Sequence, residues 1–535
     1  MGEKNLFELS RRELLESGLA AGAALVGSNA AAAAAVPELQ IGPGIYKSIG
    51  VRPVINCRGT FTIISGSTSL PEVKKAMEEA SRHYVQLDEL MEAVSRRLAQ
   101  LTGAEWGIVT AGCAAAETLA TCACVAGADP ERMQRLPNLE GMKNEVVIPR
   151  HSRNVYDHAV RMAGVRILEP ATLEELEAVV GPRTAMIYVL ADPVDTGPFG
   201  LEPIAKAAHR RAVPVFVDAA AENLTPEVHF RRGADLVAYS GGKALRGPQC
   251  AGLLLGRKDL CQAAWINSAP HHAFGRSLKV GKEEIMGMLA AVECWYGRDH
   301  KAEWKTWEGY LDTIARSVQK AAGVTTEVVQ PSGLSNNTPS LRIRWDGARL
   351  GISGREVFDL LLDGNPRINL AGSSGTRRQG IDTSSVTVVP WMMHPGDDAV
   401  VAARLSEVLS HPPKITERAK PSGPPAAIAG RWDARLEFRL GSSAHTFFFE
   451  QAGEQLVGTH QGVYASGRLD GWVEGSDVEF HAAHPIEGTQ LTYGFRGRVE
   501  GAVMQGTVDL GEYGDARWSA RRHSYEQHRT GGRTG

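Results

Sequence analysis

Residues 238–249, AYSGGKALRGPQ, follow a short apolar run and place Lys243 three residues after Ser240. Upstream, the apolar run 213–217 ends in an acid, Asp218. A strand that ends in Asp, followed by a strand that ends in Ser-x-x-Lys, is the arrangement with which α/β enzymes hold pyridoxal 5'-phosphate (PLP). The lysine amine bonds to the cofactor's aldehyde, and the acid keeps the pyridine nitrogen protonated. The glycines before Lys243 are expected to let the backbone approach the cofactor closely.

A candidate phosphate site lies earlier in the chain. Residues 106–110 are expected to form a strand, and the small residues Gly112, Cys113 and Ala114 open the helix that follows. The free N–H groups and the dipole of a helix N-terminus favour a phosphate. Alone, this pattern is typical of any tight strand–helix turn. Together with Asp218 and Lys243 it predicts the phosphate end of a PLP site, to which Ser240 adds a hydroxyl.

His151 is the candidate for the opposite face of the cofactor ring. It follows the short apolar run 146–148. An imidazole there can stack on the ring and move protons, because its pKa lies near neutral pH. The alternative is a surface-loop histidine without a role. We predict Lys243, Asp218 and His151 as the catalytic residues.

The chain resembles the fold type I PLP enzymes, in the branch of selenocysteine synthase and the D-glucosaminate-6-phosphate ammonia-lyase-like proteins. The stretches that carry the resemblance span about residues 45–410, and the most specific are the Lys243 segment and residues 278–285, LKVGKEEI. The resemblance implies PLP as cofactor, a small-molecule substrate and at least a homodimer, since active sites of this family combine residues from two subunits.

The predicted fold class is α/β, with a mostly parallel sheet covered by helices on both faces. Expected strands at 106–110, 146–148, 185–190, 213–218, 235–239 and 251–255 alternate with helices; residues 72–100 are expected to be helical and residues 283–323 to form a long helix. The predicted parts are an N-terminal arm with helices (36–100), the PLP-binding domain (101–270), a small α+β domain (271–411), a Pro-rich linker (412–429), an all-β domain (430–522) and a disordered tail (523–535).

The all-β domain shows alternating apolar runs separated by glycine turns every ten to twelve residues. This pattern predicts an up-and-down barrel or sandwich of about eight strands. It holds no cysteine and no clear catalytic group. We therefore interpret it as an assembly or lid module.

Residues 1–35 resemble a Tat signal. The twin arginines Arg11 and Arg12 precede a short apolar stretch, and an alanine run at 30–35 offers a cleavage site. Several glutamates cancel the positive charge expected of such a leader. The alternative is an Ala-rich leader without a targeting role. We predict a periplasmic or other extracytoplasmic protein without a stable membrane anchor.

Charge and cysteine usage narrow the function further. The net charge of −3 over 535 residues, with a pI of about 6.6, provides no broad basic field for nucleic acid. The seven cysteines show neither a disulfide framework nor the paired spacing of a zinc site. We expect no nucleic-acid partner and no metal.

The residues leave the reaction open between β-elimination, racemisation and transamination, and a ligand-binding protein on a PLP-fold scaffold is the non-enzyme alternative. The family resemblance favours a lyase that deprotonates Cα and eliminates the β-substituent of an amino acid or amino-sugar acid, releasing a keto acid and ammonia. The substrate carboxylate needs a guanidinium partner, which can bind it in a bidentate manner. Arg58, Arg246 and Arg367 are the candidates, and for each the alternative is a surface arginine.

Overall fold

The computed structural model describes residues 38–191, 197–377, 380–415 and 423–524. The chain divides into two units between Ile55 and Asn56. The first unit contributes helix α2 (Ile45–Ser48), and the features below belong to the second. The predicted signal segment 1–35 and nearly all of the predicted tail lie outside the described residues. Within the described ranges, none of the helices has the length and apolar character that a membrane span requires.

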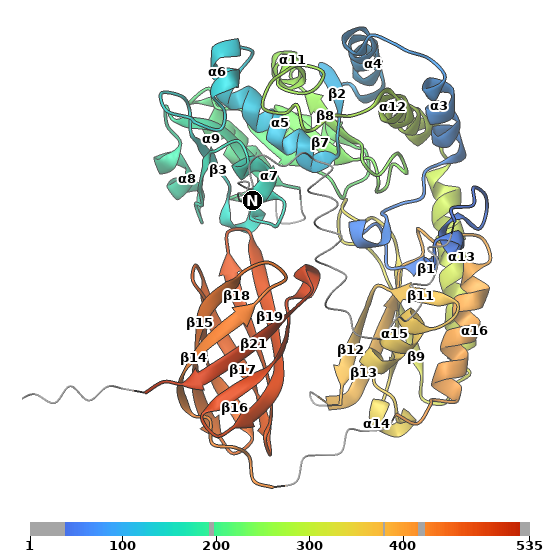
Figure 1. Cartoon of the computed structure of the whole chain (residues 1–535). Helices are drawn as coiled ribbons and strands as arrows, with labels where there is room; N and C mark the ends of the chain where they lie inside the picture. The colour runs from blue at the N-terminus through green and yellow to red at the C-terminus, as the bar shows by residue number, and fades with distance from the viewer. Residues whose placement is uncertain (1–37, 192–196, 378–379, 416–422, 525–535) are drawn as a thin grey trace, which may run out of the picture. The chain divides into compact units, whose positions relative to one another are not determined.

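A seven-stranded sheet forms the centre of the large domain (Figure 1), in the order β2-β8-β7-β6-β5-β3-β4. Strand β8 is antiparallel to both of its neighbours and the other pairs are parallel, which confirms the mostly parallel sheet. The strands are β2 (Trp106–Thr110), β3 (Glu145–Val147), β4 (Arg166–Leu168), β5 (Thr184–Leu190), β6 (Val215–Asp218), β7 (Leu236–Ser240) and β8 (Gly252–Gly256).

The central strands are buried almost throughout, which is why they read as continuous apolar runs. Strand β4 was not predicted, because it is three residues long and its first residue is exposed. The helices of this domain are α3 (Pro71–Ser81), α4 (Leu87–Thr102), α5 (Cys113–Ala126), α6 (Pro130–Arg135), α7 (Asp157–Arg161), α8 (Leu173–Val179), α9 (Leu201–His209), α10 (Pro226–Arg231), α11 (Lys258–Ile266) and α12 (Lys282–Gly297).

Two stretches predicted to be helical each contain two helices, and for 283–323 this corrects the expected single long helix. The stretch 72–100 is divided into α3 and α4, and α4 begins where the Gln86 side chain accepts from the Glu89 N–H. The stretch 283–323 is divided into α12 and α13 (His300–Val318), and α13 begins where the Asp299 carboxylate accepts from two backbone N–H groups. In each case a side-chain cap starts a second helix, which apolar periodicity does not reveal.

Helix α12 belongs to the core of the large domain. Its residues Ile285, Met288 and Val292 are buried in the same apolar cluster as the sheet. The predicted small domain, 271–411, includes this stretch, and its boundary stays a prediction.

The small domain has an antiparallel sheet in the order β12-β13-β10-β9. Helix α15 begins at a capping box made by Ser353 and Glu356. The elements after α13 are β9 (Thr325–Val329), β10 (Ser340–Trp345), α14 (Gly347–Leu350), α15 (Gly354–Asp363), β11 (Arg367–Leu370), β12 (Gly372–Thr376), β13 (Gly380–Val388) and α16 (Asp397–Ser410).

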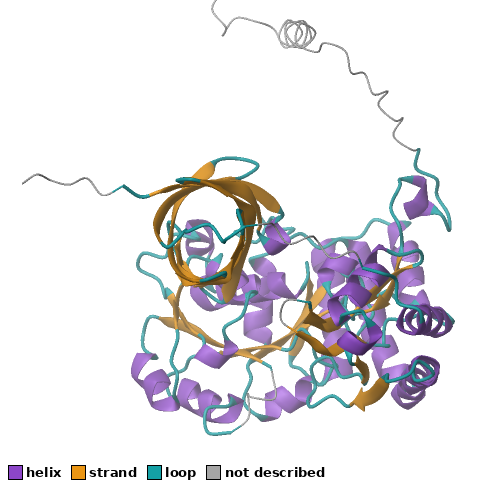
Figure 2. Ribbon diagram, turned by 90° about the horizontal axis from the view of Figure 1, so that it is seen from below, coloured by secondary structure: helices purple, strands orange, loops and turns teal. Residues whose placement is uncertain are grey.

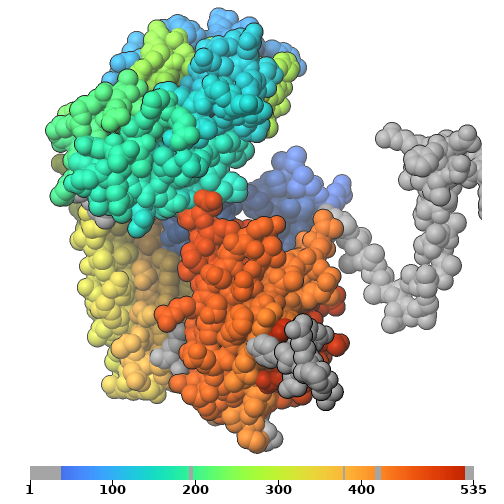
Figure 3. Space-filling view, turned by 90° about the vertical axis from the view of Figure 1, so that its left-hand side faces the viewer, coloured from blue at the N-terminus to red at the C-terminus, as the bar shows by residue number. Residues whose placement is uncertain are grey.

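The C-terminal part is a closed, eight-stranded antiparallel barrel, seen as a ring of strands in Figure 2 and as the orange-to-red body in Figure 3. Closure by β14 and β21 leaves no free edge strand. Its strands are β14 (Gly430–Glu437), β15 (Ser442–Ala452), β16 (Gln455–Gln461), β17 (Ser466–Glu474), β18 (Asp477–Ile486), β19 (Thr489–Glu500), β20 (Val503–Asp509) and β21 (Asp515–Arg522).

The barrel interior is packed with aromatic rings, among them Phe447, Phe480, Phe495 and Trp518, and burial alternates along each strand. The end of the predicted linker belongs to this core. Ile428 is buried there, and its carbonyl accepts from the Trp432 indole N–H.

Candidate PLP site

Asp218 ends strand β6 inside the protein, with 2% of its surface exposed. Its Oδ2 accepts a 2.7 Å hydrogen bond from the Tyr188 hydroxyl, and its Oδ1 accepts one of 2.9 Å from the Ala220 N–H. Tyr188 lies on the neighbouring strand β5. These two donors hold the carboxylate in place at the end of strand β6.

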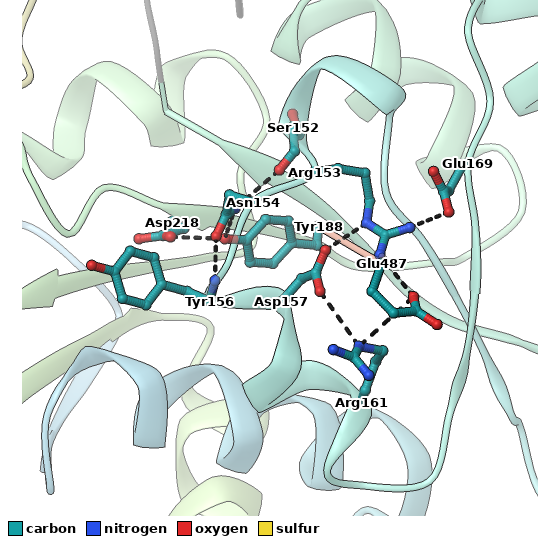
Figure 4. Close-up of polar contacts among 10 residues, drawn as sticks. All are labelled: Ser152, Arg153, Asn154, Tyr156, Asp157, Arg161, Glu169, Tyr188, Asp218 and Glu487. Atoms are coloured by element: carbon teal, nitrogen blue, oxygen red, sulfur yellow. Dashed lines mark hydrogen bonds and ion pairs between the residues drawn. The ribbon is translucent and has the colours of Figure 1, made fainter. Parts of the chain in front are cut away.

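Asn154 forms a hydrogen bond with the same Tyr188 hydroxyl that donates to Asp218. Its Nδ2 donates to the Tyr188 hydroxyl at 3.0 Å and also lies 3.0 Å from the Ser152 carbonyl. Burial raises the pKa of Tyr188 well above its ordinary value, and the nearby charge of Asp218 raises it further. The phenol therefore keeps the proton that it donates. The chain Asn154–Tyr188–Asp218 is shown in Figure 4.

Lys243 follows strand β7, the neighbour of β6, and is half-buried. Its Nζ lies 6.0 Å from the centre of the Tyr156 ring. The lysine also acts electrostatically on Cys113 and Glu117, both of which Asp218 affects as well. The structure therefore brings Lys243 and Asp218 together at the carboxyl ends of neighbouring strands.

The glycines around Lys243 serve protein packing. A Cβ on Gly241 would lie 2.7 Å from the Ala251 carbonyl oxygen, and one on Gly242 would lie 2.7 Å from the Gln249 Cα. From the sequence, we predicted that these glycines let the backbone approach the cofactor closely. In the structure, the space that their side chains would take is filled by residues 248–251 and Met288.

Gly112, Cys113 and Ala114 form the expected turn into helix α5. Gly112 is the N-cap with φ +92°, a conformation that favours glycine, and a Cβ on it would meet no atom within 4 Å. From the other side, Gly252 packs so closely that a Cβ on it would lie 2.5 Å from the Gly112 carbonyl carbon. Ser240 ends strand β7 and pairs with Gly252. The turn thus has open space in front of a helix N-terminus and protein behind it.

Glu117 is a site residue that sequence reasoning missed. It is 1% exposed, one helical turn after Cys113, and its Oε2 has no hydrogen-bond partner. Burial raises its pKa well above the ordinary value, as do the nearby charges of Asp218 and Asp157. Glu117 is therefore a carboxyl group held neutral beside Asp218. A single acid inside the apolar helix start 111–126 was the signal that could have revealed it.

Cys113, Glu117 and Asp218 place one ligand atom each within 4.8 Å of the others, and they form the one such group found among the described residues. Metal ions bind thiolates and carboxylates. Burial raises the pKa of the Cys113 thiol and of the Glu117 carboxyl, so both favour the protonated form. The donor set fits a cofactor ring held by Asp218 better than it fits a metal ion.

His151 lies in the short 3₁₀ helix Arg150–Ser152 and is exposed. Its ring makes an edge contact with Phe199, at 5.2 Å between ring centres. The aromatic ring described next to Lys243 is that of Tyr156, five residues later. The role of His151 against the cofactor ring stays a prediction.

The three candidate arginines lie in different surroundings. The Arg58 guanidinium covers the Phe61 ring at 4.5 Å, and Arg367 donates to the Leu362 carbonyl at 3.0 Å. Arg246 lines a cavity of about 250 Å³. Burial lowers the pKa of Arg246, and the nearby charge of Arg298 lowers it further.

The lining of this cavity carries more positive than negative charge. It includes the guanidinium groups of Arg246 and Arg298 against the single carboxylate of Glu303, which is paired with Arg298 at 2.9 Å. Ala244, next to Lys243 in the chain, also lines it. A cavity of this charge suits an anionic group.

The residues at the sheet edge fit PLP. Asp218 offers a buried acid for the pyridine nitrogen, Lys243 an amine for the aldehyde, and Gly112 an open helix N-terminus for the phosphate. The unfilled space at the Gly112 Cβ position is where a phosphate has room to approach.

Comparison with known proteins gives the same cofactor. The family model for Aminotransferase class-V matches residues 74–275. D-glucosaminate-6-phosphate ammonia lyase of Salmonella typhimurium (strain 14028s / SGSC 2262) is 30% identical over 382 residues, and the match covers 69% of this chain and 99% of that protein. 5'-C-glycyluridine monooxygenase-decarboxylase of Streptomyces sp is 30% identical over 382 residues, covering 68% of this chain and 92% of that protein.

L-seryl-tRNA(Sec) selenium transferase of Moorella thermoacetica is 26% identical over 283 residues, which cover 46% of this chain and 57% of that protein. The solved structure of a D-glucosaminate-6-phosphate ammonia-lyase matches with a TM-score of 0.61 and 28% identity, over 69% of this chain and 99% of that one. With Lys243 and Asp218 at the carboxyl ends of its central strands, this chain belongs to the aminotransferase class-V family of fold type I enzymes, and its cofactor is PLP.

Proposed function

We propose that this protein is a carbon–nitrogen lyase that acts on a β-hydroxy amino acid or amino-sugar acid. The substrate loses its Cα proton and its β-hydroxyl as water. The resulting enamine becomes an imine, and a second water molecule hydrolyses it to a keto acid and ammonia. No oxidant or reductant is consumed.

The observation that carries the proposal is the buried Asp218, held by Tyr188, beside the strand that leads to Lys243. When bound, PLP supplies an electron sink for the electron pair that the departing Cα proton leaves behind. An ionised Asp218 keeps the positive charge on the pyridine nitrogen, which makes that sink effective.

Lys243 is the group that we assign to the proton transfers. Its Nζ takes the proton from Cα and delivers it to the departing hydroxyl, so that water leaves. The Tyr156 ring lies 6.0 Å from this amine. The relative named D-glucosaminate-6-phosphate ammonia lyase supports a lyase over the alternative reactions.

Arg246 is our candidate for the substrate carboxylate, because it lines the positively charged cavity next to Ala244. Arg58 remains a second candidate. Export and assembly are further proposals: the twin arginines Arg11 and Arg12 support Tat-dependent export, and the family resemblance supports a homodimer or higher homo-oligomer.

The test is a panel of β-hydroxy amino acids and amino-sugar acids, supplied to the PLP-loaded protein in D₂O. The proposal expects ammonia and keto acid in equal amounts, from at least one member of the panel. Exchange of the Cα proton without ammonia would indicate a racemase, and transfer of nitrogen to an added keto acid an aminotransferase. Oxygen uptake with release of CO₂ would indicate the chemistry named for the Streptomyces relative. Each of these three results would overturn the proposed elimination.

A further inference from the structure

Two groups of polar contacts, joined through the backbone from Arg153 to Asn154, lead from the C-terminal barrel to the acid of the PLP site (Figure 4). We propose that Arg153 and Glu487 are positioning residues, and that the β18–β19 turn of the barrel holds segment 153–156 so that Asn154 keeps Tyr188 against Asp218. This inference rests on the PLP function proposed above and gives the barrel a part in it.

Arg153 is the centre of the contact. Its side chain is 6% exposed and is surrounded by three carboxylates. Its Nε donates to Asp157 at 2.5 Å, its Nη1 pairs with Glu169, and its Nη2 donates to Glu487 at 2.9 Å. A guanidinium buried this far needs such partners, because it has lost its water. One of the three is supplied by the barrel.

Gly488 gives an independent indication that the turn is fitted to this segment. A Cβ on Gly488 would lie 2.1 Å from the Asn154 carbonyl oxygen and 2.3 Å from the Asp157 Oδ2. The glycine has no positive φ, so space rather than conformation requires it. A side chain at this position would therefore have to displace the Asn154 backbone.

Segment 153–156 reaches both groups that hold the cofactor. Asn154 donates to Tyr188 at 3.0 Å, and Tyr188 donates to Asp218 at 2.7 Å. The Tyr156 N–H donates to the Asn154 Oδ1 at 2.8 Å, and the Tyr156 ring lies next to Lys243. A shift of this segment therefore changes the surroundings of Asp218 and of Lys243 at once.

The first experiment compares Gly488→Ala with Gly494→Ala in the full chain. Gly494 lies on β19 of the same barrel, where a new Cβ would meet its nearest neighbour at 3.5 Å, which is ordinary contact. We expect Gly488→Ala to weaken PLP binding to the apoprotein by about threefold to tenfold, and Gly494→Ala to leave it unchanged. The pH midpoint of the bound cofactor's absorbance should shift in the first variant alone.

The second experiment removes the charge without adding bulk. Glu487→Gln should weaken PLP binding by about twofold to fivefold, since the carboxylate is 46% exposed and its ion pair is partly screened. Glu454→Gln is its control, because Glu454 is an exposed residue of the β15–β16 turn, at the other end of the barrel. Glu487→Gln also keeps the test valid if Gly488→Ala disturbs barrel folding.

A double-mutant cycle tests the route through Asn154. In an Asn154→Ala background, Gly488→Ala should cause little further loss of PLP affinity, because the Asn154–Tyr188 hydrogen bond through which the shift acts is already gone. Additive losses, or variants that behave like their controls, would overturn the positioning role. Borohydride reduction and peptide mapping of the wild type separate the two proposals: PLP absent from Lys243 would sink the proposed function itself.

Discussion

At the scale of single residues, we predict separable roles for Lys243 and Asp218. Lys243→Ala should abolish covalent attachment of PLP and lower kcat by about 10³-fold or more, because both proton transfers are lost. Asp218→Asn should still bind some PLP but slow Cα deprotonation by about 10²-fold, because the ring nitrogen loses its anionic partner. Absorbance spectra, peptide mapping after borohydride reduction, and Cα–deuterium exchange measure these effects. Borohydride-reduced PLP on another lysine would contradict the assignment of Lys243.

Glu117 is expected to keep its proton in the folded protein. Glu117→Gln replaces a neutral carboxyl with a neutral amide, so PLP affinity should stay within about threefold of wild type. Asp218→Asn is the matched comparison, since there the same kind of change removes a needed charge. A loss of affinity in Glu117→Gln as large as in Asp218→Asn would mean that Glu117 is ionised.

The pH dependence of stability gives a second readout for Glu117. Its folded pKa is raised above the ordinary 4.5 of the unfolded chain. As pH rises through 4.5 the unfolded state loses this proton while the folded state keeps it, so the free energy of unfolding falls with pH. Glu117→Gln lacks this proton linkage. The Tm of the variant relative to wild type should therefore be higher at pH 8 than at pH 5.

Arg246 is predicted to bind the substrate carboxylate. Arg246→Lys keeps the charge but loses the planar pair of donors, so KM should rise by about tenfold or more. Arg367→Lys is the control, because Arg367 lies on strand β11 and is not among the residues that line this cavity. Steady-state kinetics on the best substrate of the panel measure KM for both variants. An equal rise in KM in both would contradict the assignment of Arg246 to the substrate carboxylate.

At the scale of elements, the barrel contains three buried histidines that favour their neutral form. His445 and His460 share a hydrogen bond of 2.7 Å, and the His460 and His484 rings lie 4.3 Å apart. Burial lowers the pKa of His445 to about 4 and that of His460 to about 2, and the neighbouring His484 contributes to both shifts. A charged imidazole in this packed interior would lose its water without gaining an acid.

These histidines should make the barrel acid-sensitive. Their folded pKa values lie below the unfolded value of 6.5, so the stabilisation is complete above pH 6.5 and is lost as pH falls toward 4 and below. Hydrogen exchange of barrel peptides, corrected for its intrinsic pH dependence, should show opening at pH 5 relative to pH 7. His460→Leu should reduce this difference, and the exposed His481→Gln should not. Equal responses in both variants would contradict the prediction.

At the scale of the whole molecule, we predict Tat-dependent export. Changing Arg11 and Arg12 to Lys should retain folded, PLP-loaded protein in the cytoplasm, because the Tat route carries folded proteins. Cell fractionation with the cofactor's absorbance as the marker measures this, and N-terminal sequencing should show removal of about the first 35 residues. Periplasmic protein that starts at Met1 would contradict cleavage.

The sequence alone predicted the mostly parallel sheet, Asp218 and Lys243 as candidate PLP residues, and a barrel or sandwich of about eight strands. Buried parallel strands appear as continuous apolar runs, and barrel strands as alternating ones, so period and composition reveal both. The chemistry of the lysine and the acid is likewise local, because it depends on the residue type at the end of a strand. These features can be recognised without knowing which segments touch.

Tertiary structure decided the rest, because it depends on which segments meet. In the sequence, Tyr188 is one residue of an apolar strand. In the folded chain, its hydroxyl donates to Asp218 at 2.7 Å. Glu117 is neutral only because the fold buries it beside Asp218. Glu487 lies 334 residues from Arg153 in the chain, and the contact between them exists because the folded chain brings the β18–β19 turn to segment 153–156. Burial and long-range contacts determine these hydrogen bonds, protonation states and ion pairs, and neither burial nor long-range contact can be deduced from a short stretch of sequence.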